Sequence, residues 1–216
     1  MKPLPNRRHL MFGTAAALAC AVVLVGSLGG CASPTPPPRL YRLAVEPPAD
    51  QAPSAPSAPS APSAPAATAE LWQLMQPVHL PEYLQRDAIL LPQGSSALQA
   101  LAGHRWAEPL ADAVSRILLN DLTLLRGSGR VWGWPLPPGV VVARQLRVEV
   151  LAFEADGSRR AVHLRARWTL VDPAGAQPPR SGRIELDAAS SGADVQALVA
   201  AHRLALWRLA QRLAAL

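Results

Sequence analysis

A tandem of Ala-Pro-Ser triplets covers residues 52–65 and divides the chain. Each proline fixes φ near −65° and removes one backbone donor, so neither an α-helix nor a β-ladder can form there. At about 3.1 Å per residue, a polyproline II rod of this length would span roughly 43 Å. A spacer, an interaction segment and an insertion into a tolerant surface loop all fit this composition. We therefore expect a disordered insertion at residues 49–69, with folded elements on either side.

The first 30 residues have the three-part pattern of a secretory signal peptide. A basic segment without acidic residues precedes an apolar run at residues 10–28, and the small residues Gly29 and Gly30 follow that run. The basic residues are Lys2, Arg7 and Arg8. A single membrane-spanning helix is the alternative, because about 18 apolar residues is near the spanning minimum. Glycines make the run only weakly apolar, so we expect a signal peptide at residues 1–30.

The sequence Leu28-Gly29-Gly30-Cys31 resembles the bacterial lipobox, which ends in a lipid-modified cysteine. Thioether formation requires a thiol, and the signal peptidase requires small residues before it. We therefore expect cleavage between Gly30 and Cys31 and acylation of Cys31, with palmitate among its lipids and no other cofactor. Several acyl chains anchor a protein stably, at ~0.8 kcal/mol per buried CH₂. The lipid on Cys31 would thus hold the mature protein at a membrane.

The residues that follow Cys31 predict where the domain is held. Residues 31–39 are rich in proline and form an expected tether with an extended reach of about 30 Å. Ala32, and not Asp, follows Cys31. By analogy with the sorting rule of enterobacterial lipoproteins, this residue favours the periplasmic face of the outer membrane over retention at the inner membrane.

The net charge argues against nucleic acid as a partner. The whole chain carries +6, but three basic residues belong to the expected signal peptide, which leaves +3. A small excess of arginine mixed with acidic residues is typical of a solvated surface and not of a polyanion-binding stripe. Both cysteines, Cys20 and Cys31, lie near the N-terminus, and the five histidines are far apart. No metal site is indicated by this spacing.

Residues 40–216 are predicted to form one domain of the α+β class, interrupted by the insertion. Alternation of apolar and polar residues predicts a series of short strands. They lie at residues 40–45, 78–80, 88–91, 132–134, 145–153, 162–170 and 183–186. Turn sequences at Asp156-Gly157 and residues 172–175 separate the last strands. We expect an antiparallel sheet with two main helices packed on one of its faces.

The two helices are predicted at residues 108–126 and 194–216, each with one apolar stripe at a spacing of three to four residues. The first stripe is Leu110, Val114, Ile117, Leu118 and Leu125; the second is Val195, Leu198, Val199, His202, Leu206, Leu209, Leu213 and Leu216. Pro109 is tolerated in a first helical turn, and Gly127 ends the first helix. His202 lies within its stripe, so we interpret it as a partly buried core residue and not as a ligand.

The sequence contains no motif that predicts catalysis. No nucleophile–base motif, P-loop or dinucleotide fingerprint is present, and Gly127-Ser128-Gly129 is too short to cradle a phosphate. His163, Arg165 and Arg167 share the polar side of one predicted strand. A solvated strand face with cross-strand partners, such as Glu149 and Glu185, explains them better than a binding strip does. We expect a protein that is not an enzyme.

Three tryptophans are candidate partner-binding residues. Trp132 and Trp134 have the same strand parity and precede Pro135, which confines a strand to a sheet edge. Such an edge suits pairing with an extended segment of a partner, and tryptophan is enriched at binding hot spots. Trp207 lies off the apolar stripe of the last helix and is expected to be exposed. The alternative places Trp132 and Trp134 in the core, where replacement by Ala would cost about 3–5 kcal/mol.

Over nearly all of its mature length, in order, the chain resembles the ABC-type transport auxiliary lipoproteins, the PqiC-type family. The most specific stretch is Trp106-Ala107-Glu108-Pro109-Leu110, which opens the first helix. The other matching stretches are Gly30-Cys31, residues 40–43, 80–90, 147–154 and 162–170, and the closing helix. The Ala-Pro-Ser repeat is a departure, because the family does not require it.

The resemblance implies an outer-membrane lipoprotein that serves as the docking end of a lipid-transport system. An MCE-domain protein would bridge the periplasm, and a permease or ABC transporter would lie in the inner membrane. The family carries no catalytic residues, and Trp106 is expected to pack at the helix entry. A stand-alone structural or envelope-assembly lipoprotein and a lipid carrier with its own apolar cavity remain as alternatives. The lipid, its direction of transport and homo-oligomerisation are left open.

Overall fold

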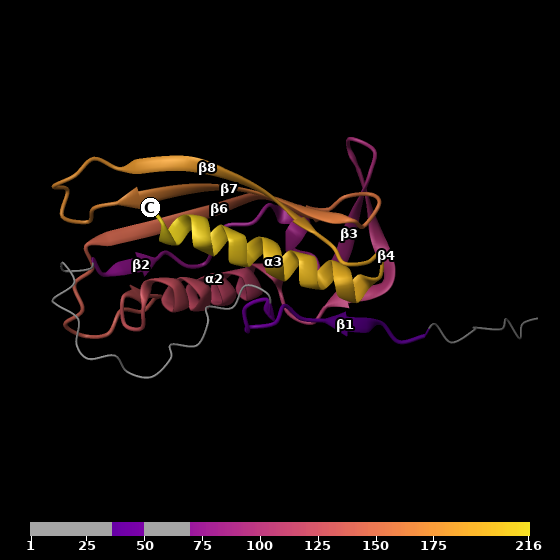
Figure 1. Ribbon diagram of the computed structural model, residues 1–216, viewed down its shortest axis with the longest axis horizontal. Helices are drawn as coiled ribbons and strands as arrows, with labels where there is room; N and C mark the ends of the chain where they lie inside the picture. The colour runs from indigo at the N-terminus through magenta and orange to yellow at the C-terminus, as the bar shows by residue number, and fades with distance from the viewer. Residues whose placement is uncertain (1–35, 50–69) are drawn as a thin grey trace, which may run out of the picture. The chain divides into compact units, whose positions relative to one another are not determined.

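Alternation of apolar and polar side chains produces three long antiparallel strands in the computed structural model, which describes residues 36–49 and 70–216 (Figure 1). They are β6 (Arg144–Ala155), β7 (Ala161–Val171) and β8 (Arg180–Ala189). In β7, the side chains of Val162, Leu164 and Ala166 are buried, whereas the residues between them are exposed. One face of this sheet is therefore packed and the other is solvated, as predicted.

Two short strands extend this sheet, one at residues 72–74, which was not predicted, and one that overlaps the predicted strand at 132–134. Both run parallel to a neighbour, whereas an antiparallel sheet was predicted. β2 (Trp72–Leu74) runs parallel to β6, and β5 (Val131–Trp132) runs parallel to β2. The strand order is β5-β2-β6-β7-β8. Parallel neighbours need a long crossover connection, and helix α2 (Leu110–Arg126) lies between β2 and β5 along the chain. The α+β class is confirmed, but the sheet is mixed and not purely antiparallel.

A second sheet of three strands has the order β1-β4-β3. It contains β1 (Arg39–Tyr41), β3 (Ala88–Gln93) and β4 (Ala97–Trp106), with β1 parallel to β4. The sequence did not predict β4, because most of its residues are exposed on both faces and no apolar alternation marks it. The predicted strand at residues 78–80 is reduced to a single bridge between His79 and Glu149.

The two predicted helices are present with slightly shorter bounds. Helix α2 begins after Pro109, and α3 (Val195–Ala214) begins after Asp194, whose side chain accepts a hydrogen bond from the Ala197 amide at 2.9 Å. A 3₁₀ turn, η3 (Glu82–Gln85), precedes β3. Figure 1 shows α3 running along the five-stranded sheet with α2 at its side. Helix α3 contacts β6, β7, β8 and α2, so it lies at the centre of the core.

Residues 38–216 form one compact unit that contains both sheets and both helices. Its first strand begins at Arg39, which is the last residue of the expected tether. The signal peptide, Cys31 and the Ala-Pro-Ser repeat lie outside the described residues. In the part of the chain that the structure describes, no helix has the length and apolar character needed to cross a membrane.

Candidate functional site

Of the three candidate tryptophans, Trp134 is the most exposed, and it lies at the β5 edge of the five-stranded sheet. Trp134 is 72% exposed, and Val141, on the same proline-rich loop, is 82% exposed. Strand β5 ends at Trp132, so Trp134 belongs to the loop and does not share a strand face with Trp132. The position of the segment at a sheet edge is confirmed, whereas the core alternative is wrong for Trp134.

The backbone beside Trp134 is fixed although its indole ring is exposed. The Trp134 amide donates to the Gln76 Oε1 atom at 3.3 Å, and the Gln76 Nε2 group donates to the Ser115 carbonyl of α2 at 3.3 Å. A Cβ atom on Gly133 would lie 2.5 Å from Gln76 Oε1 and 2.9 Å from Leu119 Cδ2. Glycine at position 133 therefore allows the loop to approach α2 closely. These contacts hold the backbone beside the Trp134 ring against α2.

The side chains of Trp132 and Trp207 are less exposed to solvent than that of Trp134. Trp132 is half-buried, and Trp207 is fully buried, so the prediction that Trp207 is exposed is wrong. The buried face of α3 is wider than one stripe, because α3 packs against α2 as well as against the sheet. Trp207 lies on this second side, and the Arg203 guanidinium lies 5.9 Å from the centre of its ring. Of the three tryptophans, only Trp134 presents its ring to solvent.

A buried ion pair between the helices also holds the N-terminal segment. Arg203 of α3 donates to both carboxylate oxygens of Asp121 in α2, and both side chains are almost wholly buried. The same guanidinium donates to the carbonyls of Glu46 at 3.1 Å and Val45 at 3.2 Å. The sequence did not predict this pair, although each residue occupies a position with apolar helical spacing. A charged residue at such a position is the signal that could have revealed it.

His202 lies inside an aromatic cluster, which confirms its interpretation as a core residue. Its ring packs edge-on against Trp106 and Phe153, with centroid separations of 5.4 and 4.8 Å. The Leu198 carbonyl lies 2.8 Å from His202 Nδ1, so this nitrogen carries a proton and donates. Burial lowers the pKa of His202 to about 4. Trp106 is also buried, as expected of a residue that packs at the entry of α2.

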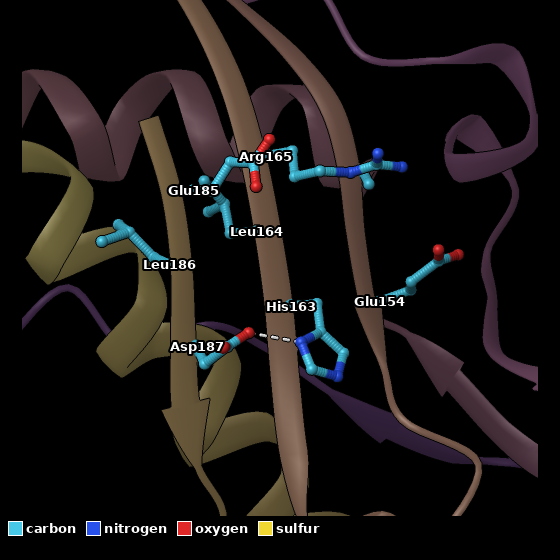
Figure 2. A pocket seen from close by; sticks show the side chains of 8 residues that line it. Glu154, His163, Leu164, Arg165, Glu185, Leu186 and Asp187 are labelled. Carbon is cyan, nitrogen blue, oxygen red and sulfur yellow. Dashed lines mark hydrogen bonds and ion pairs between the residues drawn. The ribbon is translucent and has the colours of Figure 1, made fainter. Parts of the chain in front are cut away.

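The solvated face of β7 and β8 carries paired charges above a shallow pocket (Figure 2). His163 bonds to Asp187, Arg167 pairs with Glu149 at 3.2 Å, and Arg165 lies opposite Glu185 in the strand register. Figure 2 shows the Arg165 side chain extending away from Glu185. The predicted cross-strand partner Glu149 is therefore confirmed by an ion pair. This face has the composition of a solvated surface and not of a catalytic centre.

In the ranges 36–49 and 70–216, no three His, Cys, Asp or Glu side chains are grouped in a way that could hold a metal ion. Cys31 and Gly30 lie outside these ranges, so lipidation and cleavage stay predictions. By its fold, the protein is an α+β domain. Its distinguishing surface feature is the exposed ring of Trp134 at the β5 edge of the five-stranded sheet.

Comparison with known proteins gives the family. The model of the ABC-type transport auxiliary lipoprotein component matches residues 53–214. The chain belongs to this family, which is a family of transport auxiliary components and not of enzymes. The match confirms the resemblance seen in the sequence and indicates an envelope location. No curated protein sequence matches the chain.

Among the similar solved structures, two illustrate the shared fold. The crystal structure of an uncharacterized protein has a TM-score of 0.62 and 16% identity, and the match covers 83% of this chain and 98% of that one. The crystal structure of a protein from Xanthomonas campestris has a TM-score of 0.59 and 17% identity, with 82% and 92% of the two chains covered. At this level of identity, the likeness establishes the arrangement of helices and strands.

Proposed function

We propose that this chain is a lipid-anchored docking subunit of an intermembrane phospholipid transport system that maintains the Gram-negative envelope. The observation that carries the proposal is the family match over residues 53–214. The expected lipobox and tether precede the matched residues along the chain. The lipid on Cys31 holds the domain at the periplasmic face of the outer membrane. An MCE-domain protein and an inner-membrane permease or ABC transporter are its partners.

The exposed ring of Trp134 is the proposed contact with the MCE-domain protein. A rigid, solvent-exposed tryptophan at a sheet edge supplies a large apolar contact at a low cost in conformational entropy. Val141, on the same loop, is a second exposed apolar side chain. The edge strand β5 offers main-chain groups for pairing with an extended segment of the partner.

The alternative of a lipid carrier with its own cavity has less support in the described residues. Their core is filled by packed aliphatic and aromatic side chains. The pocket in Figure 2 is lined by five charged or titratable side chains and by Ala152, Leu164 and Leu186. A more apolar groove lies between α3 and the segment after β1, but it is open to solvent and is not an enclosed cavity. A stand-alone structural lipoprotein has no specific contact in its favour.

Co-purification from native membranes tests the proposal. The full chain, cross-linked in cells and extracted with detergent, should retain an MCE-domain protein or its permease, and loss of the chain should alter phospholipid distribution between the membranes. Neighbouring genes for those partners would give independent support. An outer-membrane chain that retains neither partner, with unchanged lipid distribution after its deletion, would contradict the proposal and favour a structural lipoprotein.

A further inference from the structure

The β8 end of the five-stranded sheet is a long, regular strand edge. β8 is the terminal strand, and Figure 1 shows no described element beyond it. Its ten residues pair with β7 without a register shift, and none of them is proline. Natural edge strands are usually shortened, bulged, blocked by proline or lined with charged side chains, because free N–H and C=O groups invite another strand. Of these devices β8 has only the charged side chains, and they are of both signs. The Arg208 side chain of α3 donates a hydrogen bond to the Asp187 carbonyl near the end of β8, so one main-chain group of this edge is already occupied.

The charges along β8 are incompletely paired within the described residues. Arg183 lies directly opposite Arg167 in the register, and like charges at opposite positions are unfavourable. Arg167 has Glu149 as its partner, but no ion pair joins Arg183 to a carboxylate in the described part of the chain. Glu185, two residues further along β8, forms no ion pair there either. One strand thus presents an exposed cation and an exposed anion on the same face. Arg165 lies opposite Glu185 in the register, but neither Glu185 nor Arg183 forms an ion pair within the described residues.

We propose that β8 pairs antiparallel with β8 of a second copy of this chain, in the register centred on Ile184. This register places Arg183 opposite Glu185 of the second copy, twice by symmetry, and joins the two five-stranded sheets into one. Centring on Arg183 or on Glu185 would instead place that residue opposite its own like charge. Ile184, half-buried in one chain, meets its own equivalent on the two-fold axis. This interface goes beyond the proposed docking function and does not depend on it.

Disulfide trapping tests the register in the full, membrane-anchored chain. Directly opposite residues of antiparallel strands have Cα atoms about 4.5–5.5 Å apart, which a disulfide can bridge. Ile184→Cys should therefore give a reducible dimer in the oxidising periplasm. Ser181→Cys is the matched control on the same strand, because Ser181 lies opposite Asp187 and about 20 Å from its equivalent. The unsubstituted chain, with cysteines only at positions 20 and 31, sets the background.

A charge-swap series provides the second measurement, by sedimentation of the detergent-extracted chain. Arg183→Glu and Glu185→Arg should each weaken the dimer at least tenfold, because each creates two like-charge contacts across the axis. Mixing the two variants should restore dimers, since every cross-axis contact is then between opposite charges. Arg183→Glu also removes the Arg183–Arg167 repulsion, so its own fold should remain at least as stable.

The trapping and sedimentation experiments give different results with and without the proposed β8–β8 interface. A dimer trapped by Ile184→Cys and not by Ser181→Cys, together with restoration in the mixture, supports the interface. A chain that sediments as a monomer, equal trapping at both positions, or mixed variants that stay apart would overturn it. Trapping of a different protein at position 184 would also overturn it, because β8 would then pair with a partner's strand.

Discussion

Arg203 and Asp121 meet as a two-pronged ion pair with nitrogen–oxygen distances of 2.8 and 2.7 Å. The remaining donors of the guanidinium reach the main chain just after β1, so one side chain joins α2, α3 and the N-terminal segment. Planar guanidinium groups suit this task, because they donate along several fixed directions at once.

Breaking this pair should destabilise the domain strongly. Asp121→Ala leaves an uncompensated buried cation, and the expected loss in the free energy of unfolding is about 3–5 kcal/mol by chemical denaturation. Asp87→Ala is the matched control, because Asp87 forms an exposed pair with Arg105 and should cost about 1 kcal/mol or less. The double change Asp121→Leu with Arg203→Met should recover part of the loss. Equal effects at positions 87 and 121 would contradict this interpretation.

His202 should make stability depend on pH. Its pKa is lowered to about 4 in the folded chain, whereas an unfolded histidine titrates near 6.5, so the unfolded state binds more protons between these values. Stability is therefore fully present above pH 6.5 and falls as the pH drops toward 4. The loss attributable to His202 between pH 7 and pH 5 is about 2 kcal/mol. Denaturation curves give the free energy of unfolding of the wild-type chain and of His202→Phe at both pH values. Between pH 7 and pH 5 this free energy should fall by about 2 kcal/mol more in the wild-type chain than in the variant.

Trp134 and Trp207 should respond in opposite ways to replacement by Ala. Trp134→Ala removes an exposed ring, so the fold should persist while co-purification of the MCE-domain protein is lost, with a cost of about 2 kcal/mol or more in binding. Trp207→Ala removes a fully buried ring and should cost about 3–5 kcal/mol in folding. Thermal melts and pull-downs of both variants measure the two effects. A Trp134→Ala chain with undiminished partner recovery would exclude this contact.

Cys31→Ser should abolish membrane anchoring. Without a thiol no thioether forms, so the variant should fractionate as a soluble protein or remain as a precursor, whereas the wild-type chain should fractionate with the outer membrane. Cys20→Ser is the control, because Cys20 lies inside the expected signal peptide. Normal outer-membrane residence of the Cys31→Ser chain would remove the lipobox interpretation.

Deletion of residues 52–65 should change stability little. The triplets have small side chains, and loop-closure entropy varies only as ~(3/2)RT ln n with loop length. Thermal melts of the deleted and intact chains should agree within a few degrees. A much lower melting temperature in the deleted chain would mean that the repeat packs on the domain.

Periodicity predicted the elements that pack against the core on one face. β6, β7, α2 and α3 have buried faces that follow the predicted spacing, with Val162 and Leu164 as clear examples. β4 could not be predicted in this way, because its outer residues are exposed on both sides. The parallel placement of β2 depends on long-range packing across α2, which no local pattern encodes. Trp207 was misjudged because a helix packed against both a sheet and another helix buries more than one stripe.

Chain segments on both sides of positions 50–69 are fastened to the domain by arginines. Arg203 holds the carbonyls of Val45 and Glu46, and Arg144 holds the Glu70 carboxylate at 3.1–3.2 Å. A protease that nicked the chain between these points would therefore leave β1 and its continuation seated on the domain by non-covalent contacts. With the expected lipid on Cys31, retention of the nicked domain at the membrane would then be governed by the dissociation rate of a docked peptide, and not by the integrity of the peptide backbone.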